Sequence, residues 1–521
     1  MSKISSSGQE LNSKVLAGAN KLADLVACTL GPRGNNVILK QKDGQPIITK
    51  DGVTVSKFVD LDDPFENAGA QILKQASSQT NTNAGDGTTT STVLARELLN
   101  QSQKFILAGA STTELKRGMD IGLRRVLEKL KSMSDPVESL EEIKSVATIS
   151  ANGDDSIGSL ISEAVEMVGN NGAISVEEAK SLDTTLDVVE GFQFDSGYFS
   201  TSFITNQRRA TVEYDETLVL VTDYKIDQLN QILSILEIAA RDGRPFIIVA
   251  EQIEGQALAA LIMNTVRGTM KVAAIKAPGY GEERTAALED LAMSIGATFV
   301  SARKDKVLAD VKMSDLGVCK SIESLKNRTT FVGGNGDQDK IKEKINMLKE
   351  LVKQTDDLQE CERLQARITR LVSGVAIIRV GASTDIEMIE KKHRIEDALE
   401  AVAAAQEEGI VPGGGLALVK CQDFADDDLE GDRLTGARIL RSSLVGPIKQ
   451  MSQNAGDSHE VILNKIDESE DGLGWDFSSG QLVNMYDAGI IDPVKVTRNA
   501  LTNAVSVSST LITTSAAIVE E

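Results

Sequence analysis

The sequence predicts a multidomain protein, with mostly helical structure at both ends of the chain and α/β structure in the middle. The chain has 521 residues, well beyond the size at which a single hydrophobic core stops growing. Apolar residues recur at helical spacing near both ends, whereas short apolar runs alternate with helical segments between them. This order indicates that one domain, built from both ends, is interrupted by an insertion.

The first predicted elements are a helix and a hairpin. Apolar residues recur at helical spacing from Val15 to Val26, and the turn Thr29-Leu30-Gly31-Pro32 ends this helix. Residues 37–39 and 46–48 are largely apolar and flank an Asp43-Gly44 turn, which predicts a β-hairpin.

The following chain predicts helices and then an alternation of strands and helices. We expect helices over residues 68–76 and from just after Thr90, and α/β structure beyond residue 134. The predicted strands are 218–221, 246–250, 272–275 and 298–300, and the predicted helices among them are 228–240 and 255–266. A charged helical pair over residues 340–370 and a long helix over residues 385–408 complete the pattern.

Composition and charge exclude several classes of function. The net charge of −22 and the lack of a basic stripe argue against a nucleic-acid partner. The two histidines, His393 and His459, are too few and too distant for multi-histidine metal sites or Ser-His catalysis. The four scattered cysteines form no metal-ligand pair and are typical of thiols in a reducing compartment.

No part of the sequence predicts a membrane association. No stretch reaches the length of a membrane-spanning helix, and the first residues lack the apolar segment of a secretory signal. We therefore expect a cytoplasmic protein, or one in an equivalent reducing compartment such as an organelle matrix or the cytoplasm of a virus-infected bacterium.

The loop Gly85-Asp86-Gly87-Thr88-Thr89-Thr90 is the strongest candidate for chemistry. Its glycines permit positive φ and close backbone approach, so that successive N–H groups can point at one anion. The threonine hydroxyls and the positive end of the following helix favour phosphate, and Asp86 fits such a site if it holds Mg²⁺. A turn followed by a threonine-rich helix cap explains the same residues without any ligand. The loop lacks the Walker pattern of P-loop proteins.

Three further features are compatible with a nucleotide site. The 29–32 turn and the run Thr49-Lys50-Asp51-Gly52 offer backbone, a cation and a carboxylate, although both are also ordinary turn sequences. Asp397 lies roughly 200° around its helix from Ile395, which belongs to the apolar face. Its carboxylate is therefore either simply solvated or available to position a water molecule.

Taken together, these motifs closely resemble the group I chaperonins, the bacterial and organellar sixty-kilodalton heat-shock proteins. The resemblance covers nearly the whole chain. Besides the 29–32 turn and the 85–90 loop, the matching runs are Thr148-Ile149-Ser150-Ala151-Asn152, Asp187-Val188-Val189-Glu190-Gly191, Lys271-Val272-Ala273-Ala274-Ile275-Lys276-Ala277-Pro278-Gly279, Arg394-Ile395-Glu396-Asp397-Ala398-Leu399, Glu408-Gly409-Ile410-Val411-Pro412-Gly413-Gly414-Gly415 and Gly489-Ile490-Ile491-Asp492-Pro493.

The resemblance implies a chaperonin fold of three domains. Residues 1–132 and 408–521 would form a mostly helical equatorial ATPase domain, residues 133–189 and 374–407 a hinge-like intermediate domain, and residues 190–373 an α/β apical domain. It also implies a homo-oligomeric ring of seven subunits, single or double, with a lid-like co-chaperonin of the ten-kilodalton type. The implied function is ATP-dependent encapsulation of non-native polypeptides for folding.

The resemblance further assigns roles in a site for ATP, Mg²⁺ and K⁺. Catalysis would rest on Asp397, which orients the attacking water from the intermediate domain, and on Asp51, which assists it. The binding residues would be Asp86 for Mg²⁺, Gly87, Thr88, Thr89 and Thr90 for the phosphates, Thr29, Leu30, Gly31 and Pro32 along the nucleotide, Thr29 and Lys50 for K⁺ through backbone oxygens, and Gly414 and Asp492 on the ribose side.

A second predicted site lies in the middle of the chain. Leu229, Ile232, Leu233 and Leu236 form a helical stripe, and such stripes more often face a core. The resemblance instead implies a groove for non-native chains and for a mobile loop of a co-chaperonin. Its residues would be Tyr198, Phe203, Leu233, Leu236, Leu258, Ile262 and Met263.

The sequence also departs from the family pattern. Ser196 and Asp385 stand where an arginine and a glutamate usually pair between subunits, so this ion pair cannot form. Ser202 replaces a tyrosine of the apical groove, and Asp476 and Phe477 lie in an altered stretch near the adenine. An ATP-binding holdase or scaffold paralogue with altered ring coupling is therefore the alternative function. A small-molecule kinase would need an acceptor-site signature that the sequence lacks.

Overall fold

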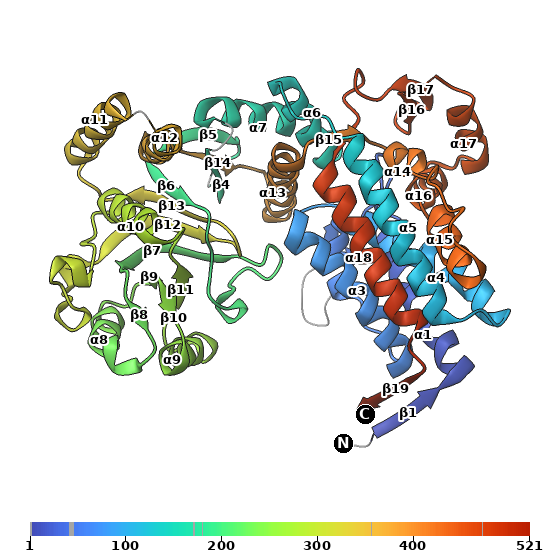
Figure 1. The fold of residues 1–521 in the computed structure, drawn as a ribbon, viewed down its shortest axis with the longest axis horizontal. Helices are drawn as coiled ribbons and strands as arrows, with labels where there is room; N and C mark the ends of the chain where they lie inside the picture. Colours follow the sequence, from blue (N-terminus) through green and yellow to red (C-terminus); the bar gives the residue numbers. More distant parts are fainter. Residues whose placement is uncertain are drawn as a thin grey trace. The chain divides into compact units, whose positions relative to one another are not determined.

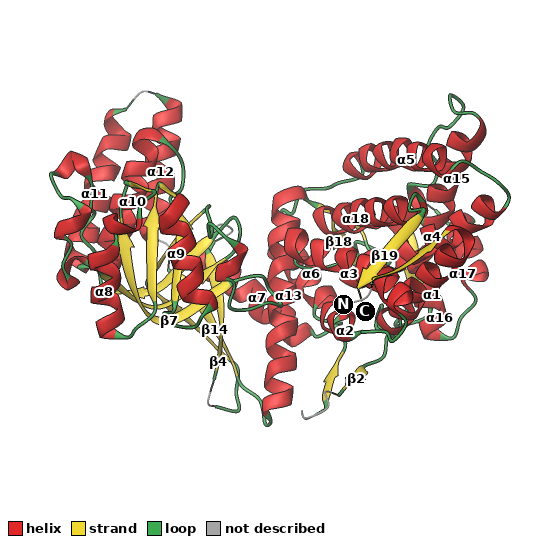
Figure 2. Cartoon of the chain, turned by 90° about the horizontal axis from the view of Figure 1, so that it is seen from below, coloured by secondary structure: helices red, strands yellow, loops and turns green. Residues whose placement is uncertain are grey.

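The computed structural model describes residues 3–40, 46–169, 172–179, 181–355, 357–372, 374–470 and 472–520. The chain forms two compact units, seen from two directions in Figures 1 and 2. Met1–Glu163, Glu178–Asp183 and Val380–Glu521 make up the first, which we call the terminal unit. Ala164–Glu177 and Thr184–Arg379 make up the second, the insert unit. The terminal unit thus contains both ends of the chain, which is the order that the alternation of predicted elements indicates.

The terminal unit is mostly helical. Its helices are α1 (Gly8–Ala27), α2 (Gly52–Phe58), α3 (Pro64–Ala84), α4 (Thr88–Leu107), α5 (Thr112–Ser132), α6 (Leu140–Ser150), α13 (Asp385–Glu408), α14 (Leu416–Lys420), α15 (Gly431–Ser443), α16 (Gly446–Ala455), α17 (His459–Asp467) and α18 (Val494–Ile512). The chain passes into the insert unit within α7 (Asp155–Val168). Buried residues of α1, α3, α4, α5, α15 and α18 form one hydrophobic core, and Figure 1 shows these long helices packed together.

Four short antiparallel strand pairs complete the terminal unit. They are β1 (Lys3–Ser7) with β19 (Ala516–Glu520), β2 (Val37–Leu39) with β3 (Ile47–Thr49), β15 (Ile410–Pro412) with β18 (Ile491–Pro493), and β16 (Leu473–Asp476) with β17 (Gln481–Asn484). Three of these pairs join segments that are close in sequence or at the two termini, whereas β15 and β18 bring two parts of the candidate site together.

Glycine permits an unusually close crossing of α1 and α3. A Cβ atom on Gly18 would lie 1.8 Å from the carbonyl oxygen of Glu66, and one on Gly69 would lie 2.1 Å from that of Val15. Each helix therefore rests directly on the backbone of the other. The position at which α3 begins is set by Asp63, which caps the helix by accepting hydrogen bonds from the amides of Phe65 and Glu66.

The insert unit is built on a six-stranded mixed sheet of order β11-β9-β7-β12-β13-β6. The strands and the helices around them are β6 (Gly191–Phe194), β7 (Val212–Val221), α8 (Leu233–Asp242), β9 (Phe246–Ala250), α9 (Gly255–Val266), β11 (Val272–Lys276), α10 (Gly281–Ile295), β12 (Gly317–Ser324) and β13 (Thr329–Gly334), with a small parallel pair, β8 (Lys225–Ile226) and β10 (Gln252–Ile253), near α8 and α9.

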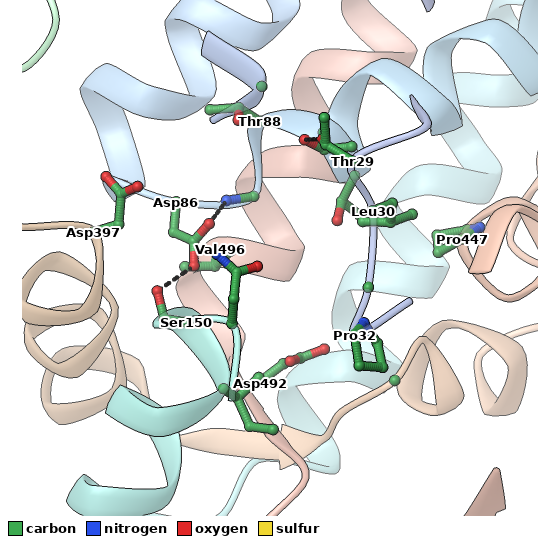
Figure 3. Close-up of a pocket in the computed structure, with 18 of the residues that line it drawn as sticks. Thr29, Leu30, Pro32, Asp86, Thr88, Ser150, Asp397, Pro447, Asp492 and Val496 are labelled. Atoms are coloured by element: carbon green, nitrogen blue, oxygen red, sulfur yellow. Dashed lines mark hydrogen bonds between the residues drawn. The ribbon is translucent and has the colours of Figure 1, made fainter. Parts of the chain in front are cut away.

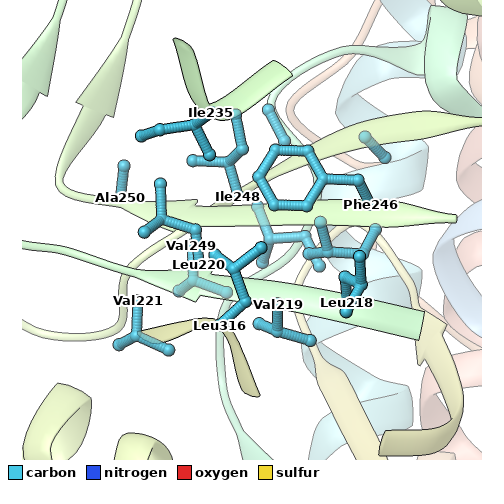
Figure 4. Close-up of a cluster of buried hydrophobic side chains, with 14 of the residues drawn as sticks. Leu218, Val219, Leu220, Val221, Ile235, Phe246, Ile248, Val249, Ala250 and Leu316 are labelled. Carbon is cyan, nitrogen blue, oxygen red and sulfur yellow. The ribbon is translucent and has the colours of Figure 1, made fainter. Parts of the chain in front are cut away.

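The strand order determines where the helices lie. β7, β9 and β11 are parallel and successive, so the right-handed crossovers place α8 and α9 on one face. The chain then returns to the other side of β7, which places α10 on the opposite face, as Figure 1 shows. Every residue of β9 is consequently buried, and Figure 4 shows Phe246, Ile248 and Val249 packed among the side chains of β7.

Two smaller elements flank this sheet in sequence. A three-stranded sheet has the order β4-β14-β5, formed by β4 (Ala173–Glu178), β5 (Thr185–Val189) and β14 (Val375–Val380). The predicted charged helical pair is present as α11 (Gln338–Gln354) and α12 (Leu358–Val372), which share a small core of Leu348, Leu364 and Ile368.

Several sequence predictions need correction. The helix predicted over 228–240 begins only at Leu233, because Gln231 accepts from the amides of Asp227 and Gln228 and holds Leu229–Gln231 in a 3-10 turn. The strand predicted over 298–300 is reduced to a single bridge between Thr222 and Val300. The hairpin of β2 and β3 is confirmed, although its predicted Asp43-Gly44 turn lies outside the described residues.

Two expectations about chemistry and membranes can be compared with the structure. Cys28, Cys319, Cys361 and Cys421 are free thiols, as the scattered spacing predicted. Among the residues that the structure describes, no helix is both long and apolar enough to cross a membrane.

Replacing Gly69 by alanine is expected to destabilise the terminal unit. The added methyl group meets backbone rather than a mobile side chain, so α1 and α3 must separate, at a cost of about 1–3 kcal/mol in the free energy of unfolding. Chemical denaturation measures this loss. The control is Ser13→Ala, at an exposed position of α1, which should leave the midpoint unchanged. Equal midpoints for Gly69→Ala and wild type would contradict the close crossing.

Candidate functional site

One pocket in the terminal unit brings together residues from widely separated parts of the chain. It encloses about 320 Å³. The predicted nucleotide-site residues that line it are Thr29, Leu30, Gly31, Pro32, Lys50, Asp51, Asp86, Gly87, Thr88, Thr89, Thr90, Asp397, Gly414 and Asp492. All fourteen predicted residues therefore share this pocket. Figure 3 shows Asp86, Thr88 and Asp397 toward one side of it and Pro32 and Pro447 toward the other.

The 85–90 loop is the tight connection between α3 and α4. Gly85 ends α3 in the left-handed region at φ 72°, and Gly87 precedes α4 at φ 82°. Thr88, Thr89 and Thr90 are the first three residues of α4, whereas the sequence predicted that the helix begins after them. Amides in the first turn have no partner within their own helix, so this end of α4 presents N–H groups and the positive end of the helix dipole.

Close contacts explain why this region contains glycines. A Cβ on Gly85 would lie 2.2 Å from Cβ of Glu400 in α13, and one on Gly87 would lie 2.6 Å from a methyl group of Val496 in α18. On Gly52, at the start of α2, it would lie 2.3 Å from the hydroxyl of Thr89. Three helices thus approach the loop more closely than side chains would allow.

Asp86 is held by two hydrogen bonds. Its Oδ1 accepts from the Gly87 amide at 2.5 Å, and its Oδ2 accepts from the Ser150 hydroxyl at 2.8 Å, as drawn in Figure 3. Burial raises the pKa of this carboxyl, and the nearby charge of Asp51 raises it further, although the two hydrogen bonds oppose the shift. A carboxylate whose charged form is disfavoured by burial and by a nearby like charge is well suited to bind a cation.

The 29–32 turn forms another wall of the pocket. Gly31 has φ 81°, and the amide of Asn35 donates to the carbonyl of Cys28 at 2.8 Å, which closes the turn. The Thr29 hydroxyl lies 3.3 Å from that of Thr89 and donates to the carbonyl of Val26. Lys50 donates through Nζ to the Gly31 carbonyl at 3.0 Å. The turn is thereby linked to both the 85–90 loop and β3.

Lys50 and Asp51 stand where β3 leads into α2. Burial lowers the pKa of Lys50, and the charge of Arg394 lowers it further. Asp51 caps α2 by accepting from the amides of Val53 and Thr54 at 3.0 and 3.1 Å. These bonds hold the Asp51 carboxylate at the pocket wall, so a plain helix cap and a role in the site coexist.

The pairing of β15 with β18 places Gly414 and Asp492 in the pocket wall. Val411 pairs with Asp492, and a Cβ on Gly413 would lie 3.0 Å from Oδ1 of Asp492. Gly414, at φ 61°, has backbone in the pocket where a Cβ would meet Met485. Burial, together with the charge of Asp86, raises the pKa of Asp492 to about 7.

Asp397 belongs to the pocket rather than to an open solvated face. Ile395 and Val402 are buried as predicted, and Asp397 is half-buried on another side of α13. Glu400, three residues further on, packs against Gly85. Since three residues correspond to about 4.5 Å along a helix, the same stretch of α13 brings Asp397 beside the 85–90 loop.

The sequence reasoning missed several residues of the pocket. Ser150 belongs to the matching run 148–152, and its hydroxyl donates to Asp86. Glu390, His393 and Arg394 also line the pocket, and Arg394 is paired with Glu390 at 2.5 Å. His393 and Arg394 lie four and three residues before Asp397, so helical spacing from Asp397 was the signal that could have identified them.

The predicted site in the insert unit is only partly at the surface. Leu233 and Met263 are exposed, with residue accessibilities of 47% and 46%, and the neighbouring Val266 is exposed as well. Tyr198, Leu258 and Ile262 are half-buried against the core. Phe203 and Leu236 are buried within it, so they are not part of the exposed surface and the predicted groove must be corrected for both.

The pocket can bind a polyphosphate together with a divalent cation. Backbone amides and threonine hydroxyls at the start of α4 suit phosphate oxygens, and the space that the glycines leave open admits close backbone approach. Burial raises the pKa of Asp86 and of Asp492, and the charge of Asp51 raises that of Asp86 further, as the charge of Asp86 does that of Asp492; a bound cation would relieve this repulsion. The residues present therefore fit Mg²⁺ with a nucleotide.

Comparison with known proteins identifies the family and the fold of the chain. The chain matches the TCP-1/cpn60 chaperonin family over residues 22–521 and belongs to this family, whose members are ATPases. Two crystal structures of the chaperonin gp146 from the bacteriophage EL 2 (Pseudomonas aeruginosa), both in the presence of ATP-BeFx, are similar to it. Crystal form II has a TM-score of 0.70 and form I of 0.63, each at 22% identity over 99% of both chains. The predicted chaperonin fold is thus confirmed.

Asp492 should make the stability of the protein depend on pH when no divalent cation is present. The folded state keeps a proton up to about pH 7, whereas an unfolded aspartate releases it near pH 4. Between these values the folded state binds more protons, so the contribution of Asp492 to the free energy of unfolding falls as pH rises.

Asp492→Asn should remove this contribution, so its stability relative to wild type should increase from pH 4 to pH 7. Thermal unfolding in a chelating buffer measures the difference, and Asp487→Asn, at an exposed position outside the pocket, is the control. A difference between Asp492→Asn and wild type that is independent of pH would contradict the assignment.

Proposed function

We propose that this protein is an ATP-dependent chaperonin subunit of the group I type, which binds non-native polypeptides and encapsulates them for folding in a ring cavity. The observation that carries the proposal is the convergence of the 85–90 loop, the 29–32 turn, Lys50, Asp51, Asp397, Gly414 and Asp492 on one pocket. Family membership supports the same function, since chaperonins are ATPases that act on unfolded chains.

The phosphates of ATP would lie on the first turn of α4. Thr88, Thr89 and Thr90 would donate to phosphate oxygens, with Gly87 allowing the backbone to approach. Asp86, oriented by Ser150, would hold Mg²⁺, and backbone oxygens of Thr29 and Lys50 would hold K⁺. When bound, Mg²⁺ neutralises charge on the phosphates. Leu30, Met451, Trp475 and Phe477 form an apolar wall against which the base would pack.

Hydrolysis would depend on Asp397 and Asp51. Phosphoryl transfer requires positioning and charge neutralisation more than covalent help, so a carboxylate that orients the attacking water is the main requirement. Asp397 would accept a hydrogen bond from this water, and Asp51, fixed at the start of α2, would assist. Because α13 packs on Gly85 through Glu400, movement of α13 would change the distance of Asp397 from the phosphates.

Assembly into homo-oligomeric rings, heptameric and single or double, is part of the proposal. Isolated two-stranded sheets are marginally stable in water, and here they carry exposed apolar residues. Ile38, Ile47 and Ile48 on β2 and β3 are exposed, as is Ile518 on β19. Such surfaces suit contacts between subunits. Residues 133–189 and 374–407 would serve as the hinge domain, and a cytoplasmic location would suit the free thiols.

Substrates and a co-chaperonin of the ten-kilodalton type would bind the insert unit, the proposed apical domain. Leu233, Met263 and Val266 form the exposed apolar part of α8 and α9, with Leu258 and Ile262 beside them. Apolar attraction carries little directional requirement, and a methionine side chain adapts to partners of different shape.

Asp397→Ala should abolish most ATP turnover while leaving ATP binding nearly unchanged. Removing a group that acts only in the transition state lowers kcat by about 10²-fold or more. Steady-state hydrolysis with Mg²⁺ and K⁺ measures kcat, and titration calorimetry measures binding. Glu407→Ala, on α13 but outside the pocket, is the matched control. Undiminished turnover in Asp397→Ala would contradict the assigned role.

Met263→Glu combined with Leu233→Glu should weaken capture of a chemically denatured test protein at least tenfold, because charge disfavours apolar contact. Suppression of aggregation measures capture, and Val461→Glu, an exposed apolar position of the terminal unit, is the control.

ATP-dependent refolding, with and without a co-chaperonin, separates the folding chaperonin from the holdase alternative: capture without ATP-dependent release would favour the holdase.

A further inference from the structure

Arg33 joins two walls of the pocket that lie more than 440 residues apart in the sequence. Its Nε donates to the carbonyl of Phe477 at 3.3 Å, and its Nη2 donates to the carbonyl of Ser478 at 2.9 Å. Phe477 and Ser478 line the pocket, and so does Pro32, the neighbour of Arg33. Arg33 itself is exposed.

The backbone on the N-terminal side fixes where Arg33 stands. The amide of Gly34 donates to the Gly31 carbonyl at 3.0 Å, and a Cβ on Gly34 would lie 2.2 Å from the carbonyl oxygen of Thr29. On the far side of the turn, Asn454 donates through Nδ2 to the carbonyls of Ala27 and Leu30, at 3.0 and 2.9 Å. The turn that carries Arg33 is therefore rigid, and the guanidinium emerges from a defined place.

The hairpin of β16 and β17 presents its carbonyls to Arg33 for an equally local reason. Asp476 accepts from the amides of Ser478 and Ser479 at 2.8 and 3.2 Å, so these N–H groups turn inward. Burial favours the neutral form of Asp476, but these hydrogen bonds outweigh it and lower the pKa of the carboxyl. With the amides occupied, the carbonyls of Phe477 and Ser478 are left for a donor from outside the hairpin.

The same hairpin supplies the apolar wall. Trp475 and Phe477 are 8% and 4% exposed, and they belong to one hydrophobic cluster with Met451, Ile448 and Met485. The side chains of this cluster, Phe477 included, anchor the hairpin, whereas the backbone carbonyls of Phe477 and Ser478, where β16 leads into the tip, are tied to the 29–32 turn through Arg33. Loss of Arg33 would therefore release the tip without unfolding the hairpin.

We infer that Arg33 is a positioning residue, which holds the tip of the β16–β17 hairpin over the base end of the nucleotide pocket and so slows the release of bound nucleotide. The inference rests on the proposed nucleotide site. A planar guanidinium holds its Nε and Nη2 donors in a fixed geometry that suits two neighbouring carbonyls, whereas a lysine would offer its donors from one rotatable ammonium and reproduce this geometry only in part. The hydrogen bonds of Arg33 go to the hairpin and not to the start of α4, where the phosphates would lie, so we expect the effect for ligands that carry a base.

The test uses the full-length protein and three variants. Arg33→Ala should weaken Mg·ADP and Mg·ATP about tenfold, mainly through faster dissociation, because two charge-assisted hydrogen bonds at an exposed site are worth about that much. Inorganic tripolyphosphate with Mg²⁺ should bind wild type and Arg33→Ala equally. Arg33→Lys should be intermediate. Arg438→Ala, a surface arginine paired with Asp426, is the matched control and should behave as wild type.

Each outcome decides a separate point. Equal nucleotide affinities and release rates for Arg33→Ala and wild type would overturn the inference while leaving the proposed function intact. An equal loss for tripolyphosphate would also overturn it, because it would indicate a general distortion. Failure of wild type to bind nucleotide would overturn both. Hydrogen exchange of residues 477–480 without ligand should be faster in Arg33→Ala, and an unchanged unfolding midpoint would separate loosening of the tip from loss of the fold.

Discussion

The structure depends on how closely the backbone can approach itself around the 85–90 loop. Glu400 of α13 packs where a side chain on Gly85 would stand, Val496 of α18 does the same at Gly87, and the Thr89 hydroxyl lies against Gly52. These contacts tie the start of α4 to helices from both chain ends. The amides of α4 are consequently presented to the pocket by a rigid core rather than by a mobile loop.

The site joins the parts of the terminal unit that lie before and after the insert unit in the sequence. β15 and β18 bring Gly414 and Asp492 to a site that otherwise consists of residues from the first part of the chain. Arg33 and Asn454 make similar links between early and late segments. Such a site exists only when both chain ends are folded together, so binding of a nucleotide would stabilise the terminal unit as a whole.

The pocket also collects carboxylates whose charges repel one another. Burial raises the pKa of Asp86 and of Asp492, and the charge of Asp51 adds to the shift of Asp86, as the charge of Asp86 adds to that of Asp492. Lys50 also lines the pocket; its amino group donates to the Gly31 carbonyl, and burial, together with the charge of Arg394, lowers its pKa. The pocket alone is therefore electrostatically unfavourable, which is the state expected of a site that a divalent cation completes.

The sequence by itself determined the chaperonin fold, the mixed α and α/β organisation and all the predicted members of the pocket, because motifs such as the 85–90 loop carry local backbone requirements. Sequence patterns predicted the structure less well where contacts between distant segments determine the secondary structure or the burial of a residue. The hydrogen bonds of the Gln231 side chain make α8 begin later than the predicted helix. Residues 298–300 form a single β-bridge and not the predicted strand. Only the tertiary structure buried Phe203 and Leu236, brought Ser150 to Asp86 and joined Arg33 to the hairpin at Phe477. These relations depend on packing between segments far apart in the chain, which no periodicity or spacing records.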